Sequence, residues 1–242
     1  MAEPAAIATL RAQIARIEGV SAKHGMLPFG LESIDRHLPA GGIAAGALHE
    51  VAGSRELADD AAATVFLAGI LARFDGPVFW CLTWRDLFAP SLHLAGLHPD
   101  RVVFVEAGSD AQVLTAMEEC LRHEGLGGVV GELKKVSLTA SRRLQLAAEQ
   151  SGVPAFLFRR ACPADVKTDG SAAVTRWRIR AAPGAALGIP SLGRPRWDLT
   201  LERARGGDAH SWIVEGCDAK GRIALPADLV HRPVAQEGRQ AA

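Results

Sequence analysis

The chain lacks several features that would assign it to a class at once. None of its hydrophobic runs approaches the roughly 18 consecutive apolar residues that a membrane-spanning helix needs. Its first residues, MAEPAAIATLRAQ, contain no basic segment followed by an apolar one, so the sequence predicts no signal peptide. We therefore expect a cytoplasmic protein that does not associate with membranes.

Cysteine is scarce and scattered. The chain has four cysteines and no CxxC pair, which argues against a zinc site or a disulfide framework and favours reduced, buried thiols. The eight histidines show no metal-ligand spacing, and no Ser/His/Asp set suggests nucleophilic catalysis. We therefore expect neither a metal nor another cofactor.

Net charge is also absent, because 27 Lys and Arg balance 27 Asp and Glu, but the two parts of the chain differ. Residues 1–158 hold 13 basic and 18 acidic residues, a charge of −5, and residues 159–242 hold 14 and 9, a charge of +5. The excess is almost all arginine and includes Arg176, Arg178, Arg194 and Arg196. Such residues are either solvated strand faces or an electropositive surface for an acidic partner or a nucleic-acid backbone.

Strands alternate with helices through most of the chain. Apolar runs predict strands over 46–52, 77–83, 101–107, 126–133 and 153–161. Helices are predicted over 60–72, 86–95, 109–123 and 137–152, the last two beginning at serine N-caps. This order predicts an α/β fold, with a mostly parallel sheet and helices on both faces. The later segments RWRIRAA, RWDLTLERARGG and SWIVEGC alternate as strands do and predict antiparallel strands at a sheet edge.

The two ends of the chain suggest separate parts. Residues 1–25 are a predicted helix and linker, 26–217 the core, and 218–242 a polar, proline-broken tail that we expect to be flexible. The helix over 5–18 carries an apolar stripe, which either packs on its own domain or docks on a neighbouring subunit; its residues include Ile7, Leu10, Ile14 and Ile17. The tail contains a short apolar set that could fold onto a partner, made of Ile223, Leu225, Leu229 and Val230.

The segment EVAGSRELADDAAATVFLAGIL has the outline of a nucleotide site: a strand, a turn at Gly53, a polar loop with Ser54 and an alanine-rich helix. A working phosphate loop places glycine, lysine and a hydroxyl residue where the helix begins. This chain has Ala58, Asp59 and Asp60 there. A carboxylate beside a triphosphate is repelled by about 1 kcal/mol or more per charge pair, even with strong solvent screening. The sequence therefore predicts no ATP turnover.

Over about residues 27–217 the chain resembles the RecA-like family. GGIAAGALHEVAGS resembles that family's entry to the ATP loop, and GLHPDRVVFVEAGSDAQVLTAMEECLR resembles the following strand and helix. The resemblance implies a RecA-like core in which the lysine and hydroxyl positions fall on Asp59 and Asp60. It also implies that Trp84 stands at the general-base position and Glu132 at that of the metal-side acid. We therefore expect no enzymatic activity.

A narrower resemblance concerns TASRRLQLAAEQSGVPAFLFRR, TRWRI and RPRWDLTLERARGG followed by HSWIVE. These segments resemble the ImuA family, the RecA-like proteins of the bacterial damage-inducible mutagenesis cassette. The resemblance implies an accessory protein of SOS-induced translesion synthesis that works beside an ImuB-like Y-family protein and an error-prone replicative-type polymerase. RecA and DNA are further candidate partners. Our candidates for partner contact are Ile7, Leu10, Ile14, Arg176, Arg178, Arg194, Arg196, Leu225 and Leu229.

Two other functions stay open from the sequence. One is a SulA-type inhibitor that binds the tubulin-like division protein, because SulA is likewise a RecA-like fold without an ATP loop. The other is an ATPase or DNA-pairing enzyme with an unorthodox loop. The tryptophans decide little, because Trp80 lies within an apolar strand, and core packing is the simpler reading for Trp177, Trp197 and Trp212 as well.

Overall fold

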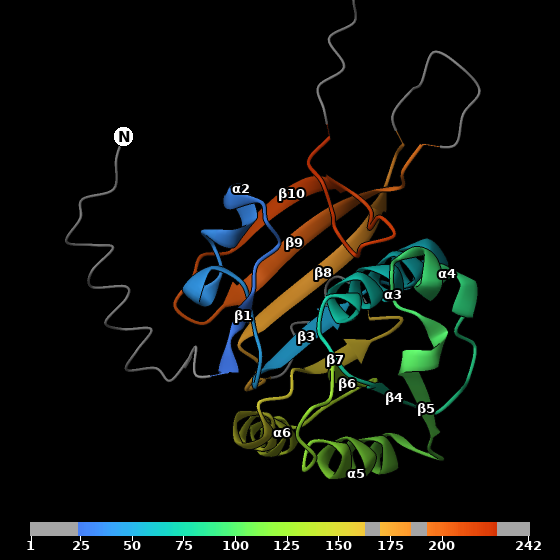
Figure 1. Ribbon diagram of the computed structural model, residues 1–242, viewed down its shortest axis with the longest axis vertical. Helices are drawn as coiled ribbons and strands as arrows, with labels where there is room; N and C mark the ends of the chain where they lie inside the picture. The colour runs from blue at the N-terminus through green and yellow to red at the C-terminus, as the bar shows by residue number, and fades with distance from the viewer. Residues whose placement is uncertain (1–23, 163–169, 185–192, 227–242) are drawn as a thin grey trace, which may run out of the picture.

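The computed structural model describes residues 24–162, 170–184 and 193–226 (Figure 1). An eight-stranded sheet runs through this part of the chain. Its strands are β3 (Leu48–Ala52), β4 (Val78–Leu82), β5 (Val102–Glu106), β6 (Gly128–Glu132), β7 (Ala155–Arg159), β8 (Thr175–Ala182), β9 (Arg196–Ala204) and β10 (His210–Glu215). The predicted helix with Ile7, Leu10 and Ile14 lies outside the described residues, as does Leu229.

The spatial order of the strands is β10-β9-β8-β3-β7-β6-β4-β5. Every neighbouring pair from β8 to β5 is parallel, and the pairs β8–β9 and β9–β10 are antiparallel. The predicted fold class is therefore confirmed. The structure adds that β8 is not an edge strand, because it pairs in parallel with β3 on one side and antiparallel with β9 on the other.

Helices cover both faces of the sheet (Figure 1): α3 (Leu57–Ala72) and α4 (Ala89–Leu94) lie on one face, and α5 (Asp110–Cys120) and α6 (Leu138–Ser151) on the other. The hydroxyls of Ser109 and Ser137 accept hydrogen bonds from the first turns of α5 and α6, as predicted. Helix α3 begins at Leu57, ahead of the predicted start at 60. Its N-cap residue makes no side-chain capping bond, so the sequence offers little to mark the start.

A small two-stranded sheet precedes this core. It pairs β1 (Met26–Leu27) with β2 (Ile43–Ala44), and the short helix α2 (Glu32–Asp35) lies between them in the chain. The side chain of Trp212 in β10 donates to the Ser33 carbonyl over 3.1 Å, which ties this small unit to the edge of the large sheet.

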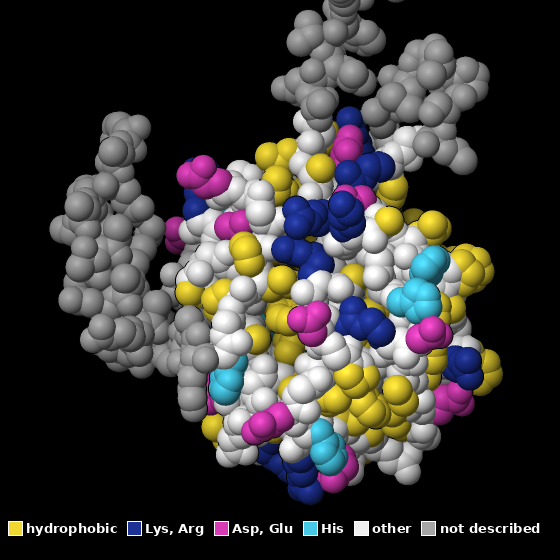
Figure 2. Space-filling model, in the orientation of Figure 1, with side chains coloured by type: hydrophobic (Ala, Val, Ile, Leu, Met, Phe, Trp, Pro, Cys, Tyr) yellow, Lys and Arg dark blue, Asp and Glu magenta, His cyan; other side chains and the backbone are white. Residues whose placement is uncertain are grey.

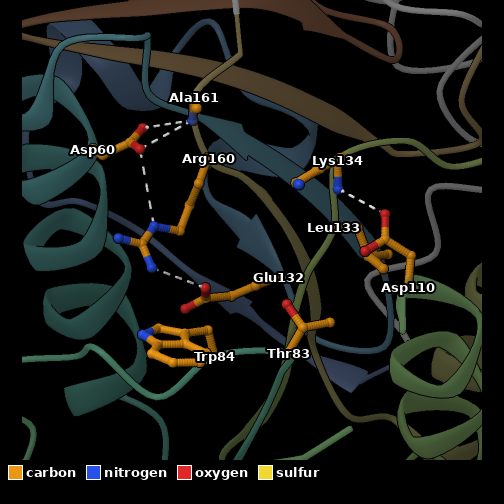
Figure 3. A pocket seen from close by; sticks show the side chains of 9 residues that line it. All are labelled: Asp60, Thr83, Trp84, Asp110, Glu132, Leu133, Lys134, Arg160 and Ala161. Carbon is orange, nitrogen blue, oxygen red and sulfur yellow. Dashed lines mark hydrogen bonds and ion pairs between the residues drawn. The ribbon is translucent and has the colours of Figure 1, made fainter. Parts of the chain in front are cut away.

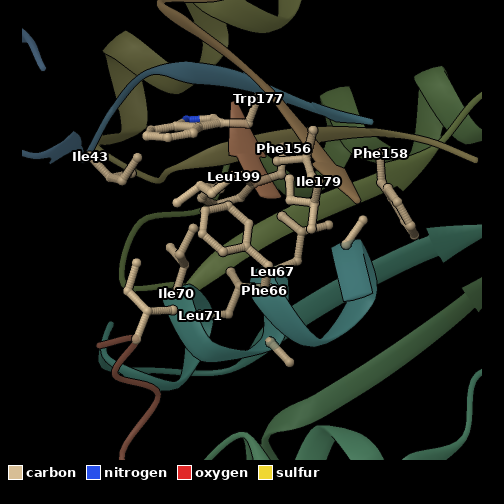
Figure 4. Close-up of a cluster of buried hydrophobic side chains, with 14 of the residues drawn as sticks. Ile43, Phe66, Leu67, Ile70, Leu71, Phe156, Phe158, Trp177, Ile179 and Leu199 are labelled. Atoms are coloured by element: carbon tan, nitrogen blue, oxygen red, sulfur yellow. The ribbon is translucent and has the colours of Figure 1, made fainter. Parts of the chain in front are cut away.

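Strand β7 shows why the strands read as continuous apolar runs. Phe156 and Phe158 pack with Phe66 and Trp177 in the cluster between the sheet and α3 (Figure 4). Leu157, which points the other way, belongs to the cluster beneath α5 and α6. Because both faces are covered, every position of β7 is buried. The predicted core positions of the four tryptophans are confirmed: Trp80, Trp177, Trp197 and Trp212 are all buried.

The packed core continues past residue 217, where the sequence suggested that a flexible tail begins. Glu215 and Ala224 pair in a β-bridge, and the Ile223 side chain is buried in the main cluster. Gly221 lies so close to α3 that an added Cβ would stand 2.2 Å from the Gly69 carbonyl oxygen. The boundary at 217 is therefore wrong for residues 218–226, since this short segment closes the end of the cluster beneath α3. Residues 227–242 lie outside the described part.

Within the described ranges, none of the helices is long and apolar enough to cross a membrane.

Candidate functional site

The carboxyl ends of the parallel strands meet at one edge of the sheet, which is where ligands bind in open α/β folds. A pocket of about 250 Å³ lies at this edge (Figure 3). Three of the six predicted site residues line it, Asp60, Trp84 and Glu132, and they come from distant parts of the chain. The pocket's lining residues are Asp60, Thr83, Trp84, Asp110, Glu132, Leu133, Lys134, Arg160 and Ala161.

Asp60, at the predicted hydroxyl position, serves as an acceptor for backbone. Its carboxylate accepts from the Ala161 N–H, at 3.0 Å for Oδ2 and 3.2 Å for Oδ1. The same carboxylate lies over Gly53, where an added Cβ would stand 2.1 Å from Oδ1. Glycine is needed at 53 because Asp60 occupies the space in front of it. Burial raises the pKa of Asp60, although the bond from Ala161 and the charge of Arg160 act against that rise.

Asp59, at the predicted lysine position, ties three segments together. Its Oδ2 accepts from the Ser54 hydroxyl at 2.6 Å, and its Oδ1 accepts from the Ala181 N–H at 2.7 Å. The Ser54 Oγ in turn accepts from the Glu56 N–H at 2.9 Å. The loop after β3 is thus bonded through Asp59 to the first turn of α3 and to the end of β8. Both carboxylates of the altered loop are engaged within the molecule.

Arg160 lies at the centre of the site, between Asp60 and Glu132 (Figure 3), and Asp86 is its third carboxylate partner. It binds Asp86 through two bonds, Nη1–Oδ1 at 2.5 Å and Nη2–Oδ2 at 3.0 Å, and its Nη1 lies 3.2 Å from Glu132 Oε2. Its Nε lies 3.9 Å from Asp60 Oδ2. The bonds from Arg160 lower the pKa of Asp86, and the bonds to Asp86 raise the pKa of Arg160. A fixed cation therefore stands among carboxylates where the family would place a nucleotide and its metal.

Glu132, the predicted counterpart of the metal-side acid, is the last residue of β6 and is buried. Its Oε1 accepts from the Trp80 indole N–H at 2.8 Å, and its Oε2 faces Arg160. Burial raises the pKa of Glu132, and its bonds to Trp80 and Arg160 oppose that rise. Both oxygens thus have partners within the protein.

Trp84, at the predicted general-base position, is 76% exposed. An indole ring has no acceptor for a proton, so this position carries no base. Leu57 and Phe88, which begin α3 and precede α4, are 79% and 69% exposed. Aromatic and large aliphatic side chains left in solvent are typical of surfaces that contact other proteins.

Arg176 and Arg178, predicted to contact partners, are instead used inside the molecule, and this correction follows from the position of β8. Their side chains are only 13% and 7% exposed. Arg176 Nε lies 3.2 Å from Glu50 Oε2, while Arg178 Nε donates to Glu202 at 2.5 Å and its Nη1 to the Gly53 carbonyl at 3.2 Å. Because β8 lies between β3 and β9, its arginines meet Glu50 of one neighbour and Glu202 of the other. An edge strand would have a neighbouring strand on one side only.

Sequence reasoning missed Arg159, the last residue of β7, and Arg160, which follows it. Arg159 Nη1 donates to Glu50 Oε1 at 2.9 Å, so the fully buried Glu50 faces two arginines from flanking strands. The signal was present in the sequence, because the pair FLFRR places two cations directly after an apolar strand. Only the strand order shows which acids they meet.

The remaining predicted contact residues lie far from the pocket. The Arg194 guanidinium donates to the carbonyls of Gly216 and Arg222. Arg196 begins β9 and is half-buried, and no ion pair joins it to another described residue. Leu225 is 44% exposed near the end of the described chain.

Among the residues that the structure describes, no three His, Cys, Asp or Glu side chains lie close enough together to hold a metal ion. The rings of His93 and His98 are in edge contact, with centroids 5.3 Å apart, and His98 faces Asp100 at 3.4 Å.

Comparisons with known proteins give the family and the fold of the chain. No protein-family model matches the chain. A curated relative, Protein ImuA of Caulobacter vibrioides, is 38% identical over 207 residues, which are 80% of this chain and 84% of the relative, with the same values in two strains. Among solved structures, the RadB recombinase is similar with a TM-score of 0.59 and 16% identity, covering 84% of this chain and 100% of that one. At that identity the likeness shows the fold, which is RecA-like as the sequence predicts.

Proposed function

The chain belongs to the ImuA family, and we therefore propose that it is an accessory protein of damage-induced mutagenesis that works by binding other proteins rather than by turning over ATP. The partner that we propose is an ImuB-like Y-family protein, which would connect the chain to an error-prone replicative-type polymerase. RecA and DNA are further candidates for contact.

The observation that carries this proposal is the state of the altered loop. Asp59 and Asp60 stand where a lysine and a hydroxyl would meet phosphates and magnesium, and their oxygens bind the Ala181 and Ala161 N–H groups. Arg160 already faces three carboxylates. A triphosphate here would meet repulsion of about 1 kcal/mol or more per carboxylate pair, and the arginine that lines the pocket is already paired with acids. This arrangement supports a RecA-like fold whose role is to bind other proteins through its surface.

The exposed side chains of Leu57, Trp84 and Phe88 support the binding role. Exposed side chains of this size cost solubility, and aromatic residues are enriched where proteins contact one another. Trp84 stands at the position of the lost general base itself, and Phe88 follows it in the same segment after β4.

Isothermal titration with Mg²⁺ and ATP tests the claim about nucleotide. We expect no measurable heat of binding. An active RecA-like recombinase, purified and titrated under the same conditions, is the positive control. Micromolar binding that depends on Mg²⁺ would contradict the proposal. Replacing Asp59 by Lys and Asp60 by Thr should not create turnover, because Trp84 still supplies no base.

Co-purification from cells treated with a DNA-damaging agent tests the claim about partners. We expect the Y-family-like protein to be recovered with the tagged chain, and damage-induced mutation frequency to fall when the chain is deleted. Recovery of the tubulin-like division protein instead, with unchanged mutagenesis, would favour a division inhibitor.

A further inference from the structure

A second, larger hollow lies away from the nucleotide position, between α3 and the ends of β8 and β9. Its volume is about 580 Å³, and we call it the alanine groove. It is formed by one side of the helix and by the two strand ends that face it. Its lining residues are Ala58, Ala61, Ala62, Val65, Ala181, Ala182, Gly184, Gly193, Arg194, Pro195, Arg196 and Trp197.

Small side chains make the groove. Ala58, Ala61 and Val65 follow one another at helical spacing along α3, and the first two are exposed. Because alanine side chains are small, they leave space between this side of α3 and the ends of β8 and β9. The described walls leave room for a large apolar side chain of a partner.

The charges of the groove have one sign. Its charged lining residues, among those described, are Arg194 and Arg196, and no acid is part of the lining. Arg194 is held in place by the carbonyls of Gly216 and Arg222, although Glu215 lies 3.7 Å from its guanidinium. On the face that Figure 2 shows, Lys and Arg side chains gather near the segment 216–226, with some acidic side chains among them. An acidic occupant would complement Arg194 and Arg196 at the rim of the groove.

The altered phosphate loop shapes the groove. Asp59 accepts from the N–H of Ala181, which is itself a lining residue, and so pins the end of β8 to the first turn of α3. Lysine at 59 could not accept this bond. The residue that removes the phosphate contact therefore also fixes the separation between the two walls.

We propose that the alanine groove binds an acidic segment of a protein partner, which places a large apolar side chain against α3 and carboxylates beside Arg194 and Arg196. The inference rests on the proposed function, since it names the surface through which the Y-family-like partner is held. A nucleic-acid backbone would satisfy the arginines but would leave the alanine floor uncovered, and this favours a protein occupant.

The test measures the affinity of the full-length chain for the purified Y-family-like protein. Ala61→Trp fills the groove from an exposed position, and Arg196→Glu reverses the charge of its rim. Matched controls on the other face of the sheet are Leu146→Trp and Arg142→Glu, both at exposed positions of α6. We expect each groove variant to bind at least tenfold more weakly than the wild type, each control to bind within twofold, and all four to melt as the wild type does.

Three results would overturn the inference, and they are distinguishable. If both groove variants bind like the wild type, the groove is not the docking surface, while the proposed function stands. If the variants lose affinity for a fluorescent single-stranded oligonucleotide, or lose self-association in light scattering, and keep the protein partner, the occupant is nucleic acid or a second copy. If the wild type itself does not bind the Y-family-like protein, the proposed function fails, and with it the inference.

Discussion

Charged residues in and just after the parallel strands are matched by ion pairs within the molecule, whereas those along the alanine groove are matched less completely. In the sheet, Glu50 meets Arg159 and Arg176, and after the strands Arg160 meets Asp86 and Glu132. In the groove, Arg194 is fixed mainly by carbonyls, and Arg196 forms no ion pair with a described residue.

The comparison shows that an excess of arginine in the sequence does not by itself identify a binding surface. β8 and β9 are neighbours and both carry arginine, yet Arg176 and Arg178 are needed inside because the sheet covers them. A cation is more available to a partner where its internal acid is distant, as for Arg194, or where no ion pair joins it to a described residue, as for Arg196. Each of the following predictions tests whether the two regions differ in this way.

The largest effect is expected from Glu50→Gln. This change keeps the shape of the side chain and leaves Arg159 and Arg176 buried without their common carboxylate. Breaking a buried ion pair costs about 3–5 kcal/mol, so we expect a loss of that size in the free energy of unfolding. Denaturation in urea measures it. The control is Glu106→Gln, whose exposed contact with Arg85 at 3.8 Å should contribute about 1 kcal/mol or less. Equal losses for the two variants would contradict the comparison.

His49 provides a pH-dependent test of the same buried region. Burial lowers its pKa from 6.5 to about 4, because desolvation disfavours the imidazolium, and the bond to the Ala44 carbonyl only partly opposes this. The unfolded chain therefore binds the proton more readily. The contribution of neutral His49 to the free energy of unfolding is fully present above pH 6.5. It decreases by about 3 kcal/mol as the pH falls toward 4.

Urea denaturation of the wild type and His49→Gln at pH 7 and pH 4.5 isolates this contribution. The variant should lose less stability between the two values, because its side chain does not titrate. Asp60 and Glu132, whose pKa values are raised, titrate in both proteins and cancel in the difference. A variant with the same pH dependence as the wild type would show that His49 is not the group responsible.

A smaller effect is expected at the altered loop. Asp60→Ala removes the acceptor of the Ala161 N–H, and an unsatisfied buried donor costs about 1–3 kcal/mol. Asp60→Asn keeps an acceptor oxygen and removes only the charge, so it should be the milder change. Thermal melting of both variants separates the two contributions. If Ala and Asn are equally tolerated, the bond to Ala161 contributes nothing measurable.

The smallest effect on stability is expected in the groove. Arg196→Gln should change the free energy of unfolding by less than about 0.5 kcal/mol, because a surface substitution away from caps and networks is nearly neutral. Chemical denaturation beside Glu50→Gln gives the contrast directly. A loss of several kcal/mol would mean that Arg196 has an internal role like that of Arg176.

The sequence by itself determined the elements and their class. Serine N-caps, apolar strands and the spacing of helices are local patterns, and they predict the parallel sheet, the starts of α5 and α6 and the buried tryptophans. The same local reading located the altered loop, since a missing lysine is visible from Asp59 and Asp60 alone. The limits of α3 and the boundary at 217 were harder, because no cap marks the first and only packing on Gly69 reveals the second.

Only the tertiary structure determines which charged residues pair with each other inside the molecule. Arg160 and Asp86 are 74 residues apart, and Glu50 and Arg176 are 126 apart, yet each pair is in contact, because strand order places β3 directly beside β8 and brings the segments after β4 and β7 to one edge. Strand order depends on how both faces of the sheet pack, which periodicity does not encode. The same packing places alanines of α3 opposite the ends of β8 and β9, and these small side chains leave a gap. The groove therefore exists only in the folded chain.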